Sequence, residues 1–219
     1  MLFSNMKKVL LVAGGWDGHQ PLKFAEVFAN ALKSKGVETT IETSLDVLGD
    51  EERLKGFDVI FPCWTMGTLT PEQSKIFLST VHSGVAVAGI HGGMGDAFRG
   101  NLDYEWMVGG HFVGHPHVGP YTVRIRDFAS PITKDLPSIF DYNSEQYYLM
   151  VDPGIHVLAD TEYVYDGRSV NMPVAWIRMW GKARVFYSAL GHHPDEFEKF
   201  PASFQLAVNG VLWAAGLLE

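Results

Sequence analysis

Histidine and glycine occur together in four short segments of this 219-residue sequence. Glycine lets a backbone approach a ligand closely and adopt positive φ, whereas histidine transfers protons near neutral pH or binds a metal ion. Seven of the nine histidines lie in these segments, which span residues 14–19, 89–93, 110–117 and 191–194. The pattern predicts one polar pocket in which histidines gather. The other two histidines, His82 and His156, are interpreted as structural.

The elements that must position these segments alternate between strand and helix in the first half of the chain. Short apolar runs predict strands at residues 8–13, 37–42, 57–62 and 85–90, and helical spacing predicts helices at 22–33, 50–55 and 71–82. This order implies right-handed crossovers and a parallel sheet that is covered on both faces. Ligands of such sheets bind outside the carboxyl ends of the strands, where the first two segments follow predicted strands.

The second half of the chain predicts further strands, several of them antiparallel. They are expected at residues 121–126, 147–150, 156–162, 174–179 and 183–188, with a tight hairpin at Gly181-Lys182 and a closing helix at 203–215. Residues 94–120 are rich in glycine and histidine, which predicts a structured active-site loop with only short helices.

Two further side chains are candidates for chemistry. Glu145 lies among aromatic and polar residues, where desolvation raises the proton affinity of a carboxyl group and suits it to general acid or base catalysis. The alternative for Glu145 is a structural salt bridge with one of the arginines of the second half. Cys63 follows a predicted strand and is either a nucleophile or, as is commoner, a buried inert thiol.

Composition excludes several classes of function. The net charge of −8 argues against binding to nucleic acid or an anionic membrane. The single cysteine is compatible with a reducing compartment, and an apolar run of the roughly 20 residues that span a bilayer is missing, so we expect a cytoplasmic protein. The turn at Gly14-Gly15 lacks the third glycine of a dinucleotide fingerprint and a P-loop lysine, so no nucleotide cofactor is expected. We expect one domain over residues 7–219, with residues 1–6 disordered or ordered by packing only.

A set of motifs spread along the chain from Lys8 onward resembles the ThuA-like (trehalose utilisation) family. The motifs are Ala13-Gly14-Gly15 with His19, Gly89-Ile90-His91-Gly92-Gly93, Gly110-His111-Phe112 with His115-Pro116, Ser144-Glu145-Gln146-Tyr147, Pro173-Val174-Ala175-Trp176, the run from Gly181 to His192, and the closing run from Asn209 to Ala214. The resemblance implies the fold of class I glutamine amidotransferases. That fold is an α/β, flavodoxin-like three-layer sandwich with a mostly parallel central sheet and some antiparallel strands in the second half.

The sequence departs from the amidotransferases at the position of their nucleophile. Those enzymes place a cysteine at a sharp strand-to-helix turn, in a Gly-x-Cys-x-Gly setting, and the matching residue here is His91. An imidazole does not replace a thiolate in forming a thioester, so glutamine amidotransferase activity is not expected. His192 or His193 falls where the triad histidine of those enzymes lies, followed by Asp195 or Glu196.

The family resemblance implies an enzyme of carbohydrate catabolism that acts on a sugar or a keto-sugar, such as a trehalose-type disaccharide derivative. In this hypothesis the protein is a hydrolase, lyase or isomerase on a keto-glycoside, and the catalytic acid and base groups are His91, His192 and Glu145. The alternative is a non-catalytic sugar-binding or regulatory module on a degenerate amidotransferase scaffold. The expected partner is a small carbohydrate, and a homo-oligomer is left open.

Substrate contacts and a metal ion complete the expectation. The residues expected to bind the sugar hydroxyls or to cover the ring are His19, His111, His115, Tyr147, Trp16 and Trp64. Imidazole suits zinc and similar divalent ions. The candidate ligands for such a cofactor are His19, His91, His115 and His192.

Overall fold

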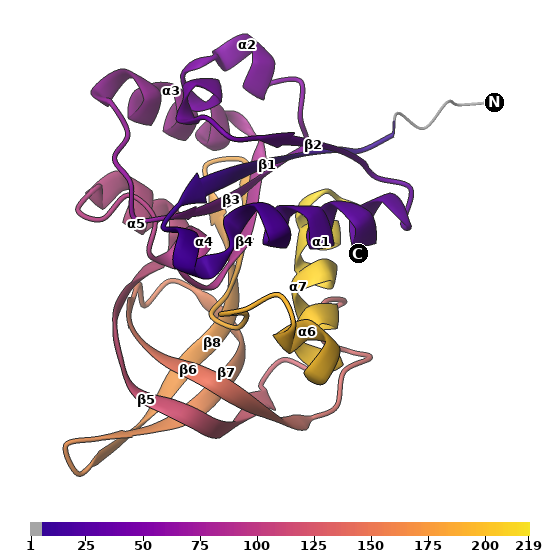
Figure 1. Cartoon of the computed structure of the whole chain (residues 1–219). Coiled ribbons are helices and arrows are strands. Elements are labelled where there is room, and N and C mark those ends of the chain that lie inside the picture. Colours follow the sequence, from indigo (N-terminus) through magenta and orange to yellow (C-terminus); the bar gives the residue numbers. More distant parts are fainter. Residues whose placement is uncertain (1–5) are drawn as a thin grey trace.

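The computed structural model describes residues 6–219, within which nine strands form one continuous sheet (Figure 1). The strand order is β2-β1-β3-β4-β9-β8-β7-β5-β6. The strands are β1 (Lys8–Gly15), β2 (Glu38–Glu42), β3 (Val59–Thr65), β4 (Ala86–Ile90), β5 (Gly110–Ile125), β6 (Ile139–Val151), β7 (His156–Tyr165), β8 (Arg168–Trp180) and β9 (Ala183–Ser188). The expected residues 1–6 outside the domain fall almost wholly beyond the described part.

Helices connect the strands of the first half and close the chain. They are η1 (Asp17–His19), α1 (Pro21–Lys33), η2 (Leu45–Gly49), α2 (Glu51–Leu54), α3 (Pro71–Ser83), α4 (His91–Gly95), α5 (Leu102–Val108), α6 (Glu196–Lys199) and α7 (Pro201–Ala214). The start of α3 shows why the sequence predicted it. Thr70 and Gln73 form a reciprocal capping box, and Pro71 occupies the first helical turn, where its missing N–H costs nothing.

The first five strands in sheet order confirm the predicted flavodoxin-like arrangement. β2, β1, β3, β4 and β9 are all parallel to one another, in the order of a doubly wound sheet. Their central members are apolar and buried along their length because helices cover both faces; Val9–Val12 and Val59–Phe61, for example, are at most 1% exposed.

Two apolar clusters lie on opposite faces of this sheet and make it the middle of three layers. One joins the sheet to α1 and α7 through residues such as Phe28 and Val211. The other joins the sheet to α3 and α5 through residues such as Phe77 and Met107. Figure 1 shows α1 and α7 together on one side and α3 on the other, which confirms the expected three-layer sandwich.

The second half corrects one prediction. Residues 110–120 were expected in a loop, but they belong to β5, which pairs with the equally long β6 in an antiparallel ribbon. The register shifts twice near Gly114, so the strand bulges where glycine and proline interrupt the regular ladder. The predicted strands at 121–126 and 147–150 are therefore only parts of β5 and β6. The hairpin at Gly181 is confirmed, with φ +57 at this glycine.

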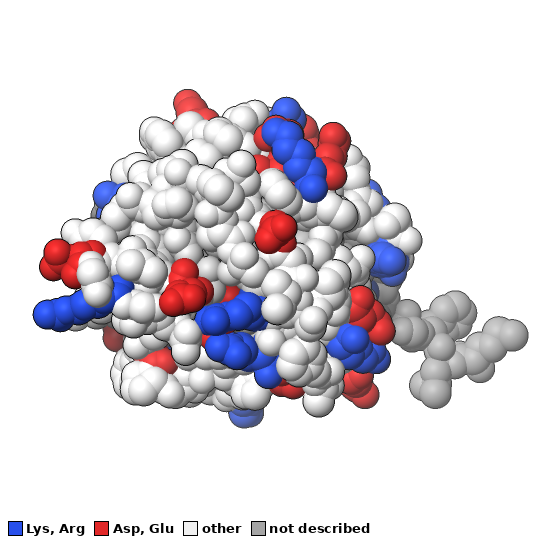
Figure 2. Space-filling view, turned by 90° about the horizontal axis from the view of Figure 1, so that it is seen from below, with Lys and Arg blue, Asp and Glu red and all other residues white. Residues whose placement is uncertain are grey.

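Charged side chains are scattered over the surface. On the face shown in Figure 2, acidic and basic groups alternate, and that view of the described residues contains no broad basic area. Among residues 6–219 the structure has no helix that is both long and apolar enough to span a membrane.

Candidate active site

His91 occupies a sharp turn between β4 and α4. Its φ is +43, in the left-handed region that non-glycine residues seldom adopt, and such strain is typical of functional turns. The buried hydroxyl of Tyr187 donates a hydrogen bond of 3.0 Å to the His91 carbonyl oxygen and so helps to hold this backbone. The strand-to-helix turn expected from the amidotransferase resemblance is therefore present, with an imidazole in the place of the thiol.

The ring of His91 is fixed on two sides. Its Nδ1 lies 2.8 Å from the carbonyl oxygen of Ala189, and the ring of Tyr147 stacks on it with 3.9 Å between centroids. A carbonyl oxygen only accepts hydrogen bonds, so Nδ1 carries the proton and Nε2 faces the site. Tyr147 is only 4% exposed and also packs against Phe112, so it forms a fixed surface for the His91 ring.

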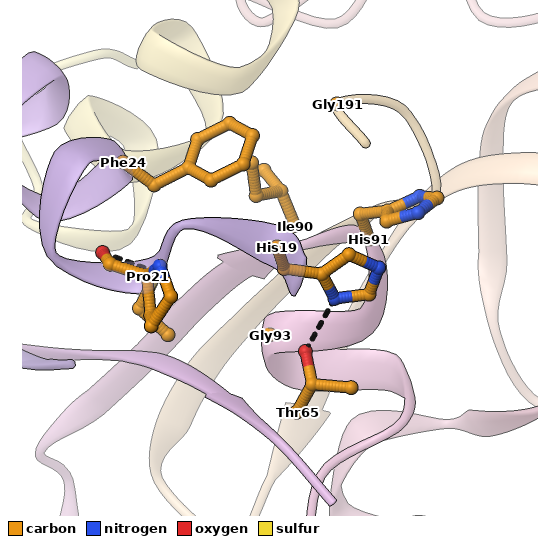
Figure 3. A pocket seen from close by; sticks show the side chains of 9 residues that line it. His19, Pro21, Phe24, Thr65, Ile90, His91, Gly93 and Gly191 are labelled. Atoms are coloured by element: carbon orange, nitrogen blue, oxygen red, sulfur yellow. Dashed lines mark hydrogen bonds between the residues drawn. The ribbon is translucent and has the colours of Figure 1, made fainter. Parts of the chain in front are cut away.

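His19 ends η1, directly after β1, and approaches His91 from the neighbouring strand. Its Nδ1 is hydrogen-bonded to Thr65 Oγ1 at 2.6 Å, and Thr65 is the last residue of β3 (Figure 3). Burial, together with the nearby His91 and His192, lowers the pKa of His19 to about 3. The ring is therefore neutral at physiological pH and offers a free nitrogen.

His192 enters from the loop that follows β9. Its backbone N–H donates to Glu196 Oε2 at 3.0 Å, and the same buried carboxylate accepts from Tyr142 at 2.6 Å and from Ser144 at 2.8 Å. Burial and the neighbouring His91 lower the pKa of His192. His193 instead turns toward Gln20, so His192 is the member of the pair that faces the site.

Glu145 comes from the antiparallel half, on β6, and meets three imidazoles. Its Oε2 lies 3.2 Å from His91 Nε2 and 3.3 Å from His192 Nδ1, and its Oε1 lies 3.5 Å from His115 Nε2. Desolvation pushes the pKa of Glu145 upward, as the sequence led us to expect. The hydrogen bond and charge of His91, with the charges of His192 and His115, outweigh burial and bring the pKa to about 2. The carboxyl group of Glu145 is therefore ionised at neutral pH.

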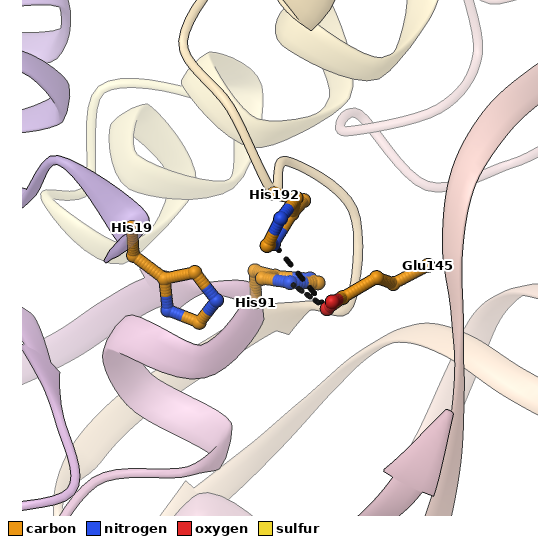
Figure 4. A group of neighbouring side chains, drawn as sticks. All are labelled: His19, His91, Glu145 and His192. Atoms are coloured by element: carbon orange, nitrogen blue, oxygen red, sulfur yellow. Dashed lines mark hydrogen bonds and ion pairs between the residues drawn. The ribbon is translucent and has the colours of Figure 1, made fainter. Parts of the chain in front are cut away.

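We call His19, His91, Glu145 and His192 the histidine–glutamate group. One nitrogen or oxygen of each residue lies within 4.8 Å of those of the others. Figure 4 shows the rings of His91 and His192 directed at the carboxylate, with His19 facing them from the opposite side. Three of the four members follow the carboxyl ends of β1, β4 and β9, where ligands of parallel sheets bind.

Space around the group is unequal on its two sides. Toward α1, a cavity of about 10 Å³ lies beside His19 and His91, lined by apolar residues such as Phe24 and Ile90, and it has room for little more than one water molecule (Figure 3). Toward solvent, Trp16 is 47% exposed and its ring packs edge-on against His19. The side chain of His115 is 42% exposed beside Glu145. The open side of the group is therefore the side of Trp16 and His115.

The structure does not bring every predicted residue to this group. His111 lies 3.4 Å from Glu105, and its contacts are with that carboxylate instead. Trp64 packs against the apolar cluster of α3 and α5. Cys63 is buried and donates to the Pro21 carbonyl oxygen, and burial raises the pKa of its thiol to about 12, which fits an inert thiol.

Sequence reasoning missed the residues that hold the group in place. Thr65 fixes His19, Tyr187 fixes the turn at His91, and Glu196 fixes the loop of His192. Thr65 follows the same rule as the histidines, because it ends a parallel strand. Tyr187 carries no such local signal, since it reads as an ordinary core position of a strand.

The buried carboxylate of Glu196 gives a test of this support. Replacing Glu196 by glutamine is expected to lower the free energy of unfolding by about 1–3 kcal/mol, because one oxygen that accepts hydrogen bonds becomes an NH₂ donor. Binding or turnover at the group should also weaken as His192 loses its anchor. Urea unfolding and ligand titration measure the two effects. Glu198→Gln, at an exposed position of the same short helix, is the control, and equal behaviour of the two variants would contradict this role.

Comparison with solved structures places the fold among known α/β proteins. A ThuA-like protein from Bacteroides uniformis ATCC 8492 is 21% identical, with a TM-score of 0.79 over 98% of this chain and 94% of its own. A ThuA-like protein from Parabacteroides merdae ATCC 43184 is 19% identical, with a TM-score of 0.78 over 98% of this chain and 92% of its own. The glutaminase domain of Trypanosoma brucei CTPS is 14% identical, with a TM-score of 0.59 over 98% of this chain and 95% of its own.

The fold is thus an α/β sandwich similar to those of ThuA-like proteins and of a glutaminase domain, and His91 lies at its sharp strand-to-helix turn. The family model described as "ThuA: Trehalose utilisation" matches residues 8–214, and the chain belongs to this family. No curated protein matches the sequence.

Proposed function

We propose that the chain is an enzyme of carbohydrate catabolism that acts on a sugar or keto-sugar at the histidine–glutamate group. The observation that supports this most is the convergence of three imidazoles and one ionised carboxylate from four separate segments. So many titratable side chains in one place cost stability unless they serve a function. Trehalose utilisation, the description of the family, supports a disaccharide derivative as the substrate class.

The reaction that suits this group is proton transfer at a carbon next to a carbonyl. Glu145 takes the proton, the C–H electron pair forms a carbon–carbon double bond, and the carbonyl electron pair moves to its oxygen. His91 and His192 lie beside this carboxylate, where they can stabilise the charge that develops on that oxygen. If the carbon that lost its proton carries a hydroxyl, the proton returns from Glu145 to the former carbonyl carbon, the hydroxyl proton moves to the enolate oxygen, and the result is an isomerase. If a glycosidic oxygen is bonded to the carbon on the other side, that C–O bond breaks, the carbonyl forms again, the oxygen takes the proton from Glu145 and leaves as an alcohol, and the result is a lyase. Addition of water to the product of that loss completes a net hydrolysis.

The contacts to the sugar are proposed on the open side of the group. Trp16 offers an exposed apolar ring to a sugar face, and His115 can bond a hydroxyl while it touches Glu145. His19, a member of the group, and Tyr147, which stacks on His91, are both buried, so neither lies on the open side; Tyr147 is assigned to positioning. Glutamine hydrolysis is left out of the proposal because His91 occupies the nucleophile position.

The surroundings of the reaction belong to the same proposal. The partner is a small carbohydrate rather than nucleic acid or a membrane surface, in keeping with the net charge of −8. We also propose a cytoplasmic location, which a single buried, reduced cysteine suits. A homo-oligomer is compatible with this function.

Turnover of trehalose and of its 3-keto form by the purified protein, followed by NMR, tests the proposal. We expect the keto form to be converted, and His91→Ala to abolish conversion while the circular dichroism spectrum stays that of the wild type. His156→Ala, at a surface histidine that pairs with Asp127, should retain wild-type rates. If the sugars raise the melting temperature without any product, and His91→Ala changes affinity only, the protein is the non-catalytic binding module instead.

A further inference from the structure

We infer that the histidine–glutamate group binds one divalent transition-metal ion of the zinc class, with His19, His91, His192 and Glu145 as its ligands. As a statement about the reaction, this rests on the proposed function: Glu145 Oε2 would bind the ion, and Oε1, which faces His115, would remain to take the proton. As a statement about binding, it stands on the geometry of the four side chains and needs no substrate.

The spacing of the side chains already approaches that of a coordination shell. Metal–ligand distances of about 2.0–2.2 Å in a tetrahedral zinc site place the ligand atoms about 3.3–3.6 Å apart. Glu145 Oε2 lies 3.2 Å from His91 Nε2 and 3.3 Å from His192 Nδ1. Since all four ligand atoms lie within 4.8 Å of one another, shifts of about 1 Å are enough to complete the shell.

The hydrogen bond of His91 determines which of its nitrogens is free. Because Nδ1 donates to the Ala189 carbonyl oxygen, Nε2 is the nitrogen that faces Glu145 Oε2, 3.2 Å away. The rings of His19, His91 and His192 lie close together, with centroids 5.0–5.4 Å apart. One divalent ion satisfies the whole group.

His192 supplies a second, independent observation. Its Nδ1 is buried and has no hydrogen-bond partner among the described residues, although Glu145 Oε2 lies 3.3 Å away. Buried polar atoms in folded proteins are almost always paired, and an exception calls for a ligand. Here the unpaired nitrogen points into the group, so a metal ion completes its bonding.

The residues behind the four ligands form the outer shell that metal sites need. Ligating histidines usually hold their second nitrogen on a carbonyl or another polar group, which fixes both ring and tautomer. His91 has the Ala189 carbonyl oxygen for this purpose, and His19 has Thr65 Oγ1. Glu145 is supported in the same way, because its second oxygen faces His115. The group therefore differs from the expected set of metal ligands in one residue: Glu145 takes the place of His115, which contacts Glu145 instead.

The types of donor select the kind of ion. Three imidazole nitrogens and one carboxylate oxygen suit zinc and its transition-metal neighbours. Magnesium and calcium prefer shells made of oxygen ligands, so they are expected to bind much more weakly. Cys63 takes no part, because its Sγ is bonded to the Pro21 carbonyl oxygen on the other side of the small cavity.

Metal content and calorimetry test the inference directly. The full chain is purified without a histidine tag, stripped with EDTA and titrated with Zn²⁺, and the bound metal is counted by mass spectrometry. We expect one ion per chain and a rise in melting temperature on binding. Mg²⁺ in place of Zn²⁺ should give neither effect at the same concentration.

Four variants separate the group from other histidines. His91→Ala and Glu145→Gln should each lower Zn²⁺ affinity by at least about 100-fold, and Thr65→Val by about 10–100-fold, as loss of an outer-shell partner does. Gly92→Ala removes no ligand, but its new Cβ would lie 2.5 Å from His19 Cε1 and displace that ring, so affinity should also fall. His156→Ala is the control and should bind as the wild type does.

Two results would overturn the inference. One is the lack of bound ion and of binding heat in the stripped, folded wild type. The other is Zn²⁺ binding that stays unchanged in His91→Ala and Glu145→Gln. Turnover is measured separately, because it reports on the proposed function. If the ion binds but no sugar is converted, the proposed enzymatic function is wrong and the metal site is still supported. If the stripped protein and the metal-loaded protein turn over the sugar equally fast, the chain is an enzyme and the ion takes no part in its reaction.

Discussion

Replacing Glu145 by glutamine is expected to lower kcat on a keto-sugar by about 10²–10⁴-fold, the usual contribution of a general base. Glutamine keeps the size of the side chain and its place on β6, but it loses the negative charge that His91, His192 and His115 surround. Neither the nitrogen nor the oxygen of the new amide is basic enough to take a proton from carbon. The effect should therefore fall on kcat more than on KM, and steady-state kinetics with the keto-sugar measures it.

The same strand offers a matched control for this variant. Asp141 also lies on β6, but it is exposed and four residues away from the group, so Asp141→Asn removes an equal charge from the strand alone. We expect Asp141→Asn to retain the wild-type kcat within a factor of about 2, since surface substitutions of this kind have small effects. If Glu145→Gln were as active as Asp141→Asn, Glu145 would not be the base.

Replacing Trp176 by alanine is expected to lower the free energy of unfolding by about 3–5 kcal/mol, the range for large aromatic residues in a core. Trp176 is 0% exposed, and its Nε1 donates to the Val108 carbonyl oxygen at 2.8 Å. Its ring packs against Tyr187 with 4.6 Å between centroids. Alanine leaves a cavity and an unpaired carbonyl. In a domain of this size the melting temperature should fall by about 6–20 °C.

Met179 on the same strand gives the control for packing. Its side chain is 55% exposed, so Met179→Ala should change the free energy of unfolding by no more than about 0.5 kcal/mol. Urea unfolding of both variants separates the two cases through the midpoint, with the slope unchanged. A loss below about 1 kcal/mol in Trp176→Ala would mean that the site collapses around the missing ring.

The parallel half of the fold was predictable because each of its signals is local. Buried parallel strands appear as short apolar runs. Helices are recognised by the spacing of their apolar residues and by capping residues, as at Thr70 and Pro71. The structure confirms both kinds of element, with shifts of one to three residues at their ends in strands such as β1 and β3.

The long ribbon of β5 and β6 was not predictable in the same way. Residues 110–120 contain glycine and proline, which read as a loop, and the register shifts near Gly114 remove the alternation that marks a strand. These residues form a strand because they pair with β6, about 30 residues further along the chain. The local sequence gives no sign of a pairing partner at that distance.

The site was predictable in membership more than in detail. His91, His192, His19 and Glu145 were all singled out, because glycine-flanked histidines after strands meet at one edge of a sheet. The direction of the Glu145 pKa shift was not predictable. Burial alone raises this pKa, and the histidines that lower it become neighbours only in the folded structure. His111 and His115 differ by four residues in the same strand, yet only His115 contacts Glu145, since the bulges between them decide which way each side chain turns.

The order in which the sheet uses its strands has a consequence for assembly. The chain leaves the parallel layer after β4, builds four antiparallel strands, and then returns with β9 to pair beside β4. His91 meets Glu145 across 54 residues and the Ala189 carbonyl oxygen across 98. A nascent or partly unfolded chain therefore carries scattered imidazoles and no working centre. The histidine–glutamate group is complete only once β9, the last strand in the sequence, has paired beside β4, so its formation marks the completion of the fold.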